Sequence, residues 1–512
     1  MADAYPHLTW SQVAPGVWQR GVDEIEQFYS SMVVLYEASG RMFFGITGFL
    51  SLSVEVPKDK GADAVGQEVD QALEKAWLSL RYDHPTIASQ VTQNIEKNEW
   101  TKSYTQFKDE NDRIAWLRNT FVPVSTGQTG LEWANSDPPA PRLPTLFVVK
   151  PTAVSTHPAV IRRDLVFRSP HDIIDGIGTL IMLNNLIGHA SRAFRQGATF
   201  KLPIFDGSEV VNLSPSYRIA ANVPAELSPE QKTRLEGVIA QKARVRAATD
   251  VEILALPYRK GALVPGKHQR VALTLSAEQT AQLLAVCKAA EVTPTHLFHA
   301  AAAMVDRDIQ PPSAEAKRVR YINYILRNER SSCLEPYNTT KHPAGLYHSV
   351  SGPSLVVDMD LLEGGKMADP ELRKDEFHSI VRQMKDFYHE VHHDTEHSVL
   401  APGLWAIGNP TVPPSPRPLP VPPPNPHPSV SISSMGRVDI IVAPKTGDFR
   451  VHDAWVTGEE LGNGLGLFLG TFDGKLCLST AYNDAWHTEE DVSGFLHRCK
   501  EIVFDGMGIP AV

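Results

Sequence analysis

The chain has 512 residues, which at about 150 residues per domain allows two to four domains. Hydrophobic residues make up 42% and charged residues 21%, so the chain can form a large core and is not an intrinsically disordered protein. The 49 Lys and Arg residues against 59 Asp and Glu residues give a net charge of −10. Because the sequence also lacks a dense basic run, we exclude nucleic acid as a partner.

The cysteines and the apolar runs indicate where the chain resides. The four cysteines lie far apart and form no CxxC pair: Cys287, Cys333, Cys477 and Cys499. This usage is typical of a reducing compartment. The first residues, MADAYPHLTW, lack the apolar segment of a signal peptide, and the longest apolar run, residues 33–52, is broken by Glu37 and Arg41. We expect that run to form two strands, or a strand and a turn, and the protein to be cytoplasmic, monomeric and without a membrane span.

The first half of the chain has the pattern of an α/β lobe, which we place at residues 1–225. The expected elements are a helix at 65–82, strands at 145–150 and 159–167, and a helix at 175–193. His84-Pro85 ends the first helix, because the residue before a proline is pushed out of the helical region.

A connection at residues 226–268, which begins with a helix after Ser228, leads to a second lobe at residues 269–512. The expected strands of this lobe lie at 270–275, 319–326, 354–359, 429–433, 438–442, 467–472 and 475–482, and its helices at 277–290, 295–306 and 489–503. Residues 409–428 are dominated by proline, which cannot join a sheet ladder, so we expect an exposed stiff loop there.

The most informative segment is Ser169 to Gly176, with the sequence SPHDIIDG. It places His171 between the end of an expected strand and the start of a buried helix, where α/β folds position catalytic groups. A histidine there can take a proton in one step and return it in the next. Taken alone, the segment favours a purely structural role slightly over a catalytic one. In the structural role, His171 is a capping residue in a turn and Asp175 complements the helix dipole.

The wider sequence changes this balance. His171-x-x-x-Asp175-Gly176 after a strand resembles the HxxxDG motif of the chloramphenicol acetyltransferase-like superfamily, which includes plant BAHD acyltransferases and peptide-synthetase condensation domains. Further segments are similar to that superfamily in the same order: AWLSLRYDHP at 76–85, LTLSAEQTAQLLAVCKAAEVTPTHLFHAAAA at 273–303, YINYILR at 321–327, SISSMG at 431–436 and KLCLSTAYN at 475–483. The resemblance covers the chain from about residue 65 onward.

Within the superfamily the chain looks most similar to fungal acyltransferases of the trichothecene 15-O-acetyltransferase type. Pro170 stands where condensation domains carry a second histidine, which argues against peptide-bond synthesis on carrier proteins. The DFGWG motif of BAHD enzymes has no equivalent in residues 451–466. The resemblance implies an α/β fold of two lobes, each a mixed sheet flanked by helices, with an active-site tunnel between them.

The resemblance also implies the chemistry of the site. His171 would act as the general base that takes the hydroxyl proton of the acceptor as its oxygen attacks a thioester. Ser433 or Ser434 would donate a hydrogen bond to the tetrahedral oxyanion. For this serine pair, turn-forming hydroxyls at a strand end are an equally good interpretation.

Structural support of the site is expected from Asp175, Gly176 and Arg327. Arg327 would form an ion pair with Asp175, and Gly176 would let a neighbouring backbone approach beside the tunnel. We expect acetyl-CoA, or another acyl-CoA, as co-substrate, with no bound cofactor and no metal. No glycine-rich loop marks a site for the CoA phosphates.

A competing motif lies at His389-Glu390-x-x-His393, with His397 beyond it, which matches the HExxH pattern of zinc peptidases. The same helix carries an apolar stripe at helical spacing, formed by Phe377, Ile380, Val381, Met384, Phe387, Tyr388 and Val391. His389 and His393 fall opposite this stripe, so we expect them to face solvent rather than to hold a catalytic metal.

The sequence therefore predicts an acyl-CoA-dependent O-acyltransferase, acting with acetyl-CoA on a hydroxyl of a small secondary metabolite such as a terpenoid or polyketide. Three alternatives remain at this point: transfer of a longer or carrier-bound polyketide acyl group, a zinc hydrolase at His389 and His393, and a non-catalytic binding protein.

Overall fold

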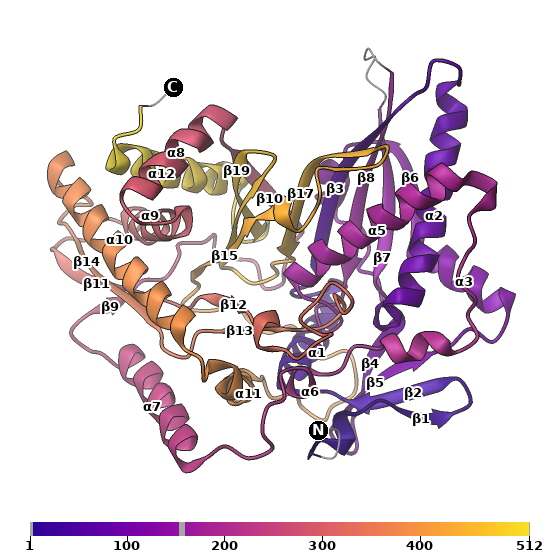
Figure 1. Cartoon of the computed structure of the whole chain (residues 1–512). Coiled ribbons are helices and arrows are strands. Elements are labelled where there is room, and N and C mark those ends of the chain that lie inside the picture. Colours follow the sequence, from indigo (N-terminus) through magenta and orange to yellow (C-terminus); the bar gives the residue numbers. More distant parts are fainter. Residues whose placement is uncertain (1–3, 153–158, 511–512) are drawn as a thin grey trace.

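The computed structural model describes residues 4–152 and 159–510. Two lobes built of sheets and helices lie side by side, with the first part of the chain on the right of Figure 1 and most of the second part on the left. Within the described ranges, no helix has both the length and the apolar character needed to cross a bilayer. The two-lobed α/β architecture expected from the sequence is confirmed.

The N-terminal lobe is built on a sheet of six strands in the order β16-β17-β3-β8-β7-β6. Strand β8 lies inside this sheet and pairs antiparallel with β3 and β7. Helices α2 and α5 pack against each other and share one apolar core with these strands (Figure 1). The elements are β3 (Ile46–Glu55), α2 (Ala62–Asp83), β6 (Phe121–Gly127), β7 (Thr145–Pro151), β8 (Val160–Ser169), α5 (Gly176–Gln196), β16 (Lys445–Thr446) and β17 (Phe449–Gly458).

A smaller antiparallel sheet, in the order β1-β2-β5-β4, lies below the large sheet in Figure 1, close to helix α1. Helix α1 begins with a capping box, in which Asp23 and Glu26 each bond the backbone N–H of the other. The elements of this region are β1 (Ser11–Ala14), β2 (Val17–Gly21), α1 (Glu24–Tyr36), β4 (Ser89–Asn94), β5 (Glu99–Thr105) and α6 (Tyr217–Ala220). Helices α3 (Glu110–Thr120) and α4 (Gly130–Ala134) contact strands β6, β7 and β8 of the large sheet.

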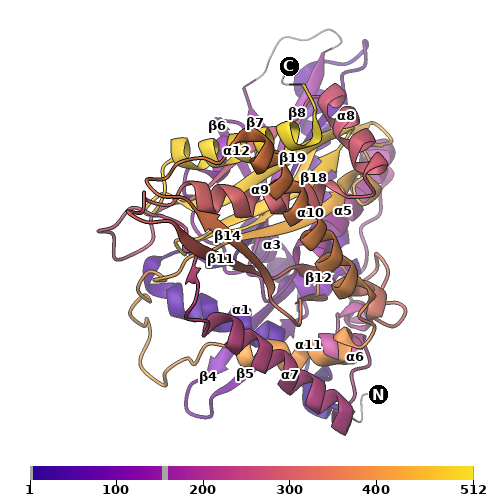
Figure 2. The same ribbon diagram turned by 90° about the vertical axis from the view of Figure 1, so that its left-hand side faces the viewer.

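The C-terminal lobe holds the sheets β10-β19-β18-β15 and β14-β11-β9, and a short ribbon β12-β13. Helices α8, α9, α10 and α12 surround these sheets, while α7 and α11 lie near α1 at the bottom of Figure 2. The strands are β9 (Glu252–Ile253), β10 (His268–Thr274), β11 (Lys317–Asn323), β12 (Leu326–Asn328), β13 (His348–Val350), β14 (Leu355–Leu361), β15 (Val430–Arg437), β18 (Leu465–Phe472) and β19 (Lys475–Asn483). The helices are α7 (Pro229–Arg246), α8 (Ala277–Ala289), α9 (Pro294–Asp308), α10 (Pro370–His393), α11 (His397–Gly408) and α12 (Glu489–Met507).

The chain crosses the expected lobe boundary late in the sequence. Strand β17 pairs antiparallel with β3 along its whole length, so residues 445–458 belong to the sheet of the N-terminal lobe rather than to the lobe expected at 269–512. Without β17, the edge of β3 would carry unpaired backbone groups. The late strand therefore ties the two lobes together beside the segment that contains His171.

Two sequence expectations about local structure are wrong. Residues 33–36, expected in a strand, form the end of α1, and the expected strand at 438–442 is a 3₁₀ turn at Val438–Ile440. In that turn Val438 and Val442 are both buried in the core of the N-terminal lobe. Two apolar residues four positions apart lie on one side of a helical turn, so burial of both selects the turn over a strand.

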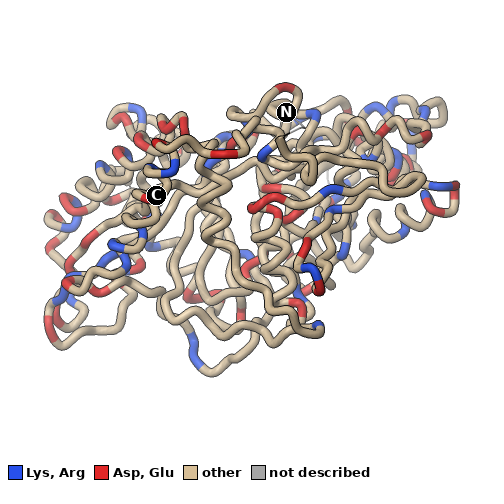
Figure 3. The backbone as a smooth tube through the Cα atoms, turned by 90° about the horizontal axis from the view of Figure 1, so that it is seen from below, with Lys and Arg blue, Asp and Glu red and all other residues tan. Residues whose placement is uncertain are grey.

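Charged residues of both signs are interleaved along both lobes (Figure 3).

Candidate active site

His171 lies in the short connection between β8 and α5. Strand β8 ends at Ser169, the chain turns with a hydrogen bond from the Ile173 N–H to the Pro170 carbonyl of 3.3 Å, and α5 begins at Gly176. Because β8 is an inner strand of the large sheet, its end is held rigidly from both sides. The His171 side chain is 9% exposed and lines a cavity. Its Nδ1 atom is buried and makes no hydrogen bond within the described residues.

The surroundings of His171 favour its neutral form. Burial, followed by the proximity of His348, lowers the pKa of His171 from 6.5 to about 3. The imidazole is therefore unprotonated at neutral pH, which is the state that can accept a proton.

Asp175 is the N-cap residue of α5 and does not contact His171 through a hydrogen bond. Its Oδ1 accepts from the backbone N–H of Gly178 at 2.7 Å, and its Oδ2 accepts from Arg330 Nη1 and from the backbone N–H of Tyr347, both at 2.9 Å. Burial alone would raise the pKa of Asp175, but Arg330 and His348 hold it well below its usual range. The carboxylate thus fixes the start of α5 to two segments of the C-terminal half.

The structure corrects the expected partner of Asp175. Arg327, in the short strand β12, forms an ion pair with Glu329 at 2.9 Å and donates to the Val391 carbonyl at the end of α10. The chain then turns, and Arg330, three residues later, reaches Asp175. The side chain of Arg327 still lines the cavity, but it does not form the ion pair expected from the sequence.

The close approach expected at Gly176 occurs instead at Gly178. A Cβ atom added to Gly176 would meet Val456 and Met435 at 3.5 and 3.8 Å, which are ordinary contact distances. A Cβ atom on Gly178 would lie 2.1 Å from the carbonyl oxygen of Pro343. The backbone at Pro343 therefore packs against the first turn of α5 only because residue 178 is glycine.

Ser433 and Ser434 lie on β15, and both line the cavity that contains His171. Ser433 is the more buried of the two, with 9% of the residue exposed. The Ser434 hydroxyl is paired with the Thr295 hydroxyl of α9 at 2.8 Å. The structure thus brings His171 and both serines to one cavity, and Ser433 is the serine whose hydroxyl is not paired with Thr295.

Two aromatic residues that sequence reasoning missed complete the surroundings of His171. The ring of Tyr29, on α1, is stacked on the His171 imidazole with centroids 3.8 Å apart and an angle of 11°. The Tyr29 hydroxyl is 2.9 Å from His348 Nε2, and the His348 ring lies 5.4 Å from the His171 ring. Neither residue belongs to a motif, and they are 142 and 177 positions away from His171 in the sequence, so no local signal could have identified them.

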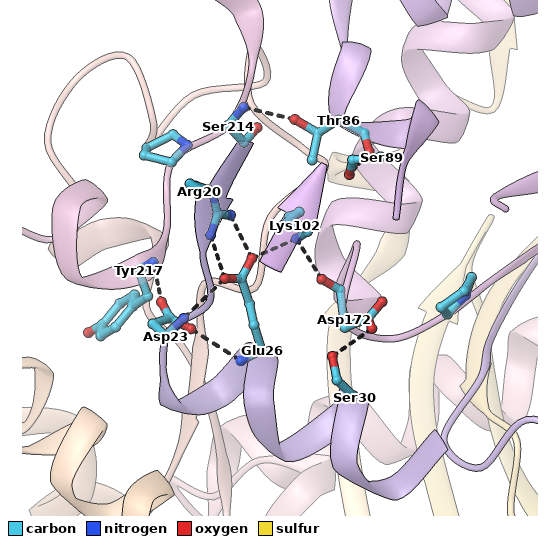
Figure 4. A network of polar contacts seen from close by, with 12 residues as sticks. Arg20, Asp23, Glu26, Ser30, Thr86, Ser89, Lys102, Asp172, Ser214 and Tyr217 are labelled. Carbon is cyan, nitrogen blue, oxygen red and sulfur yellow. Dashed lines mark hydrogen bonds and ion pairs between the residues drawn. The ribbon is translucent and has the colours of Figure 1, made fainter. Parts of the chain in front are cut away.

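A buried polar network fixes the connection between β8 and α5, which contains His171, through contacts to Asp172 (Figure 4). The Glu26 carboxylate of α1 binds Arg20 and Lys102, each at 2.6 Å. Lys102 also donates to the backbone carbonyl of Asp172 at 2.7 Å, and the Ser30 hydroxyl donates to Asp172 Oδ2 at 2.7 Å. Helix α1, strands β2 and β5, and the residue next to His171 are therefore fixed to one another.

The cavity has a volume of about 350 Å³ and is bounded by both halves of the chain. Its walls include His171, His348, Ser433, Phe44, Trp405 and Tyr324. A second cavity of about 320 Å³ shares Phe44, Tyr324, Ser431 and Glu460 with it, and a third of about 370 Å³ shares Leu326 and Ser434. The site thus adjoins open space in two directions, as two substrates meeting at His171 would require.

The competing HExxH motif forms no such site. His389 and His393 are exposed on α10, with ring centroids 4.1 Å apart. His397 is buried on α11, where its Nε2 lies 2.8 Å from the Ser349 hydroxyl. In the described ranges, no three His, Cys, Asp or Glu side chains are grouped so that they could hold a metal ion.

A family model described as 15-O-acetyltransferase Tri3 matches residues 63–386. The chain belongs to this family. This membership makes the protein an acyltransferase, as expected from the HxxxDG motif and the segments around it.

Comparisons with individual proteins agree with the family. The acyltransferase is 24% identical to the acetyltransferase pigO of Monascus ruber, over 98% of this chain and 99% of the relative. It is also 24% identical to the O-acetyltransferase pigM of Monascus ruber, over 70% of this chain and 63% of the relative.

Solved structures show the same fold. The trichothecene 15-O-acetyltransferase TRI3 from Fusarium sporotrichioides superposes with a TM-score of 0.77 at 18% identity, over 99% of both chains. The condensation domain of the monacolin K polyketide synthase MokA superposes with a TM-score of 0.58 at 12% identity, over 96% of this chain and 98% of that one.

Proposed function

We propose that the acyltransferase transfers an acetyl group from acetyl-CoA to a hydroxyl of a small secondary metabolite, with His171 as general base. The observation that carries the proposal is a neutral, buried imidazole in a cavity between two halves of the molecule that Ser433 also lines. The names of the relatives, which are acetyltransferases, support the acetyl group, and the names of pigM and TRI3 support an oxygen acceptor.

In the proposed reaction the acceptor oxygen attacks the thioester carbonyl carbon while His171 takes the hydroxyl proton. General-base help of this kind contributes about 10² to 10⁴-fold to the rate. The tetrahedral oxyanion accepts a hydrogen bond from Ser433, which is worth about 10² to 10³-fold for a single fixed donor. Collapse breaks the carbon–sulfur bond, the protonated His171 returns its proton to the leaving thiolate, and the products are the ester and free CoA.

Asp175 supports this chemistry without taking part in proton transfer. Its two oxygens are occupied by the N–H groups of Gly178 and Tyr347 and by Arg330. These bonds hold α5 and the preceding connection in place, so Asp175 is a positioning residue. Loss of the carboxylate would leave the buried Arg330 cation unpaired, which costs about 3 to 5 kcal/mol of stability.

The test is the release of free CoA thiol from acetyl-CoA in the presence of candidate alcohols. We expect release that depends on both the alcohol and His171, with His171→Ala folded but slower by about 10² to 10⁴-fold. His497→Ala, which removes an exposed histidine of α12 away from these cavities, is the matched control and should keep full activity, and a chelator should leave the wild-type rate unchanged. Acyl-CoAs of increasing chain length in the same assay show whether acetyl is the preferred group. A folded His171→Ala protein with full activity would overturn the proposal.

A further inference from the structure

His171 is oriented without the carboxylate that commonly holds a catalytic histidine. Asp175 lies four residues away, but its oxygens bind Gly178, Arg330 and Tyr347 instead. In the ranges that the structure describes, the buried Nδ1 of His171 has no hydrogen-bond partner of good geometry, although backbone groups of His171 and Ile174 lie close enough to raise its pKa. A general base must keep its ring in one orientation to meet the reacting proton, and contact with a neighbouring side chain can hold this imidazole in place.

The face of the His171 ring supplies that contact. Tyr29 lies parallel to the imidazole at a centroid distance of 3.8 Å, and its side chain is buried. Rotation of the imidazole about its bond to Cβ would drive the ring edge into the tyrosine ring. Stacking therefore restricts the direction in which the ring nitrogens point.

Tyr29 is itself held at its hydroxyl. Its hydroxyl is 2.9 Å from His348 Nε2, and His348 Nδ1 faces Asp175 Oδ2 at 3.8 Å. Trp405 closes the other side of His348 with its ring edge-on at 5.7 Å. Contacts thus run from Asp175 to His348, from His348 to the Tyr29 hydroxyl, and from the Tyr29 ring to the face of the His171 ring.

The backbone that carries Tyr29 is fixed to the connection that carries His171. Ser30, the next residue on α1, donates to the Asp172 carboxylate, and Glu26, one turn earlier, binds Lys102, which donates to the Asp172 carbonyl (Figure 4). These bonds keep α1 and residue 172 at a constant distance. The stacked rings therefore form a rigid unit.

We propose that Tyr29 and His348 are positioning residues that hold the His171 imidazole in its reactive orientation, Tyr29 by stacking on the ring and His348 by fixing the Tyr29 hydroxyl. This inference rests on the proposed function of His171 and assigns its orientation to residues outside the HxxxDG motif.

The first test replaces Tyr29. Tyr29→Leu keeps an apolar side chain but removes the ring, and we expect kcat to fall by about 10²-fold, the loss associated with a misplacement of about 1 Å, while the KM for acetyl-CoA changes by less than about threefold. Tyr29→Phe keeps the stacked ring and loses only the bond to His348, so it should recover most of that loss. Tyr258→Leu, a tyrosine away from the cavity, is the control for removing a tyrosine ring. Equal losses in Tyr29→Leu and Tyr29→Phe would overturn the role of stacking.

The second test is a double-mutant cycle. Tyr29→Phe removes the hydroxyl and His348→Phe removes the ring nitrogens of the hydroxyl–imidazole bond, so the double variant should lose little more kcat than His348→Phe alone. Losses that multiply would overturn the role of His348.

The third test needs no substrate and separates this inference from the proposed function. With ¹³C-labelled histidine, the His171 signal is assigned as the one that is absent from His171→Ala. Stacking on Tyr29 should shift that signal upfield through the ring current, with the shift lost in Tyr29→Leu and kept in Tyr29→Phe. An unchanged His171 signal in Tyr29→Leu would overturn the stacking. A wild-type enzyme that transfers no acetyl group would overturn the proposed function while these signals still report on the ring.

Discussion

Two glycines at the start of α5 show how a single residue decides where two segments meet. Gly176 has room for a Cβ atom, whereas a Cβ atom on Gly178 would lie 2.1 Å from the Pro343 carbonyl oxygen and 2.7 Å from Arg330 Nη2. Gly178→Ala should therefore push apart the two segments that Asp175 joins, and we expect a loss of about 1 to 3 kcal/mol or more in the free energy of unfolding. Chemical denaturation measures this loss, with Gly176→Ala as the control. Equal stability of the two variants would show that the segments separate without cost.

The residues of the site were predictable only where the signal is local. His171, Asp175 and Gly176 follow from a strand, a turn and a helix in adjacent sequence. Arg330 could not be distinguished from Arg327, because the choice depends on how the chain turns after β12, where a 3₁₀ turn at Arg330–Ser332 brings Arg330 to Asp175. Tyr29 and His348 belong to no sequence motif, because their contacts with His171 and with each other arise only when the chain has folded.

At the scale of single elements, helix α1 carries Tyr29, and a buried lysine on strand β5 fixes this helix to the connection that contains His171. Lys102 lies between the Glu26 carboxylate and the Asp172 carbonyl, and its side chain is 1% exposed. Lys102→Met removes this charge and leaves a buried carboxylate with one cation instead of two. We expect a loss of about 3 to 5 kcal/mol in the free energy of unfolding.

Lys60→Met is the matched control for that variant. Lys60 pairs with Glu68 at 2.8 Å, but both side chains are more than 40% exposed, and exposed pairs contribute about 0 to 1 kcal/mol. Denaturant unfolding of the two variants gives the comparison. If both lose the same small amount, the buried network does not anchor α1.

Elements with strong local patterns were predicted well. The helix expected at 65–82 is α2 (Ala62–Asp83), and the strands expected at 145–150 and 159–167 are β7 and β8. The errors fall in short apolar runs: residues 33–36 continue helix α1, and residues 438–442 form a helical turn that buries Val438 and Val442. Strand β17 went unrecognised because its burial comes from pairing with β3, which lies some 400 positions earlier.

For the whole molecule, buried histidines link stability to acidity. Burial is the main cause that lowers the pKa of these side chains, to about 3 for His171 and His299 and to about 4 for His84 and His342. They stay neutral in the folded protein, whereas the unfolded chain takes up their protons below a pH of about 6.5. Stability is therefore full above about pH 6.5 and falls as the pH drops toward 3 to 4.

His299, a fully buried histidine outside the active site, provides the test. Each such histidine contributes about 1.4 kcal/mol per pH unit, so between pH 6.5 and 5 the wild-type enzyme should lose about 2 kcal/mol more than His299→Gln. Free energies of unfolding at the two pH values measure the difference, and His389→Gln, an exposed histidine, should follow the wild type. An equal loss in the wild type and in His299→Gln would contradict this account of acid sensitivity.

The central claim for the whole molecule is that two substrates meet at a neutral His171 in a cavity between the lobes. Its most direct test is single-turnover formation of the labelled ester from isotopically labelled acetyl-CoA and an alcohol acceptor, with acetyl-CoA binding measured separately. We predict that His171→Ala binds acetyl-CoA as the wild type does but forms ester about 10² to 10⁴-fold more slowly. Ester formation at the wild-type rate by folded His171→Ala would contradict the claim.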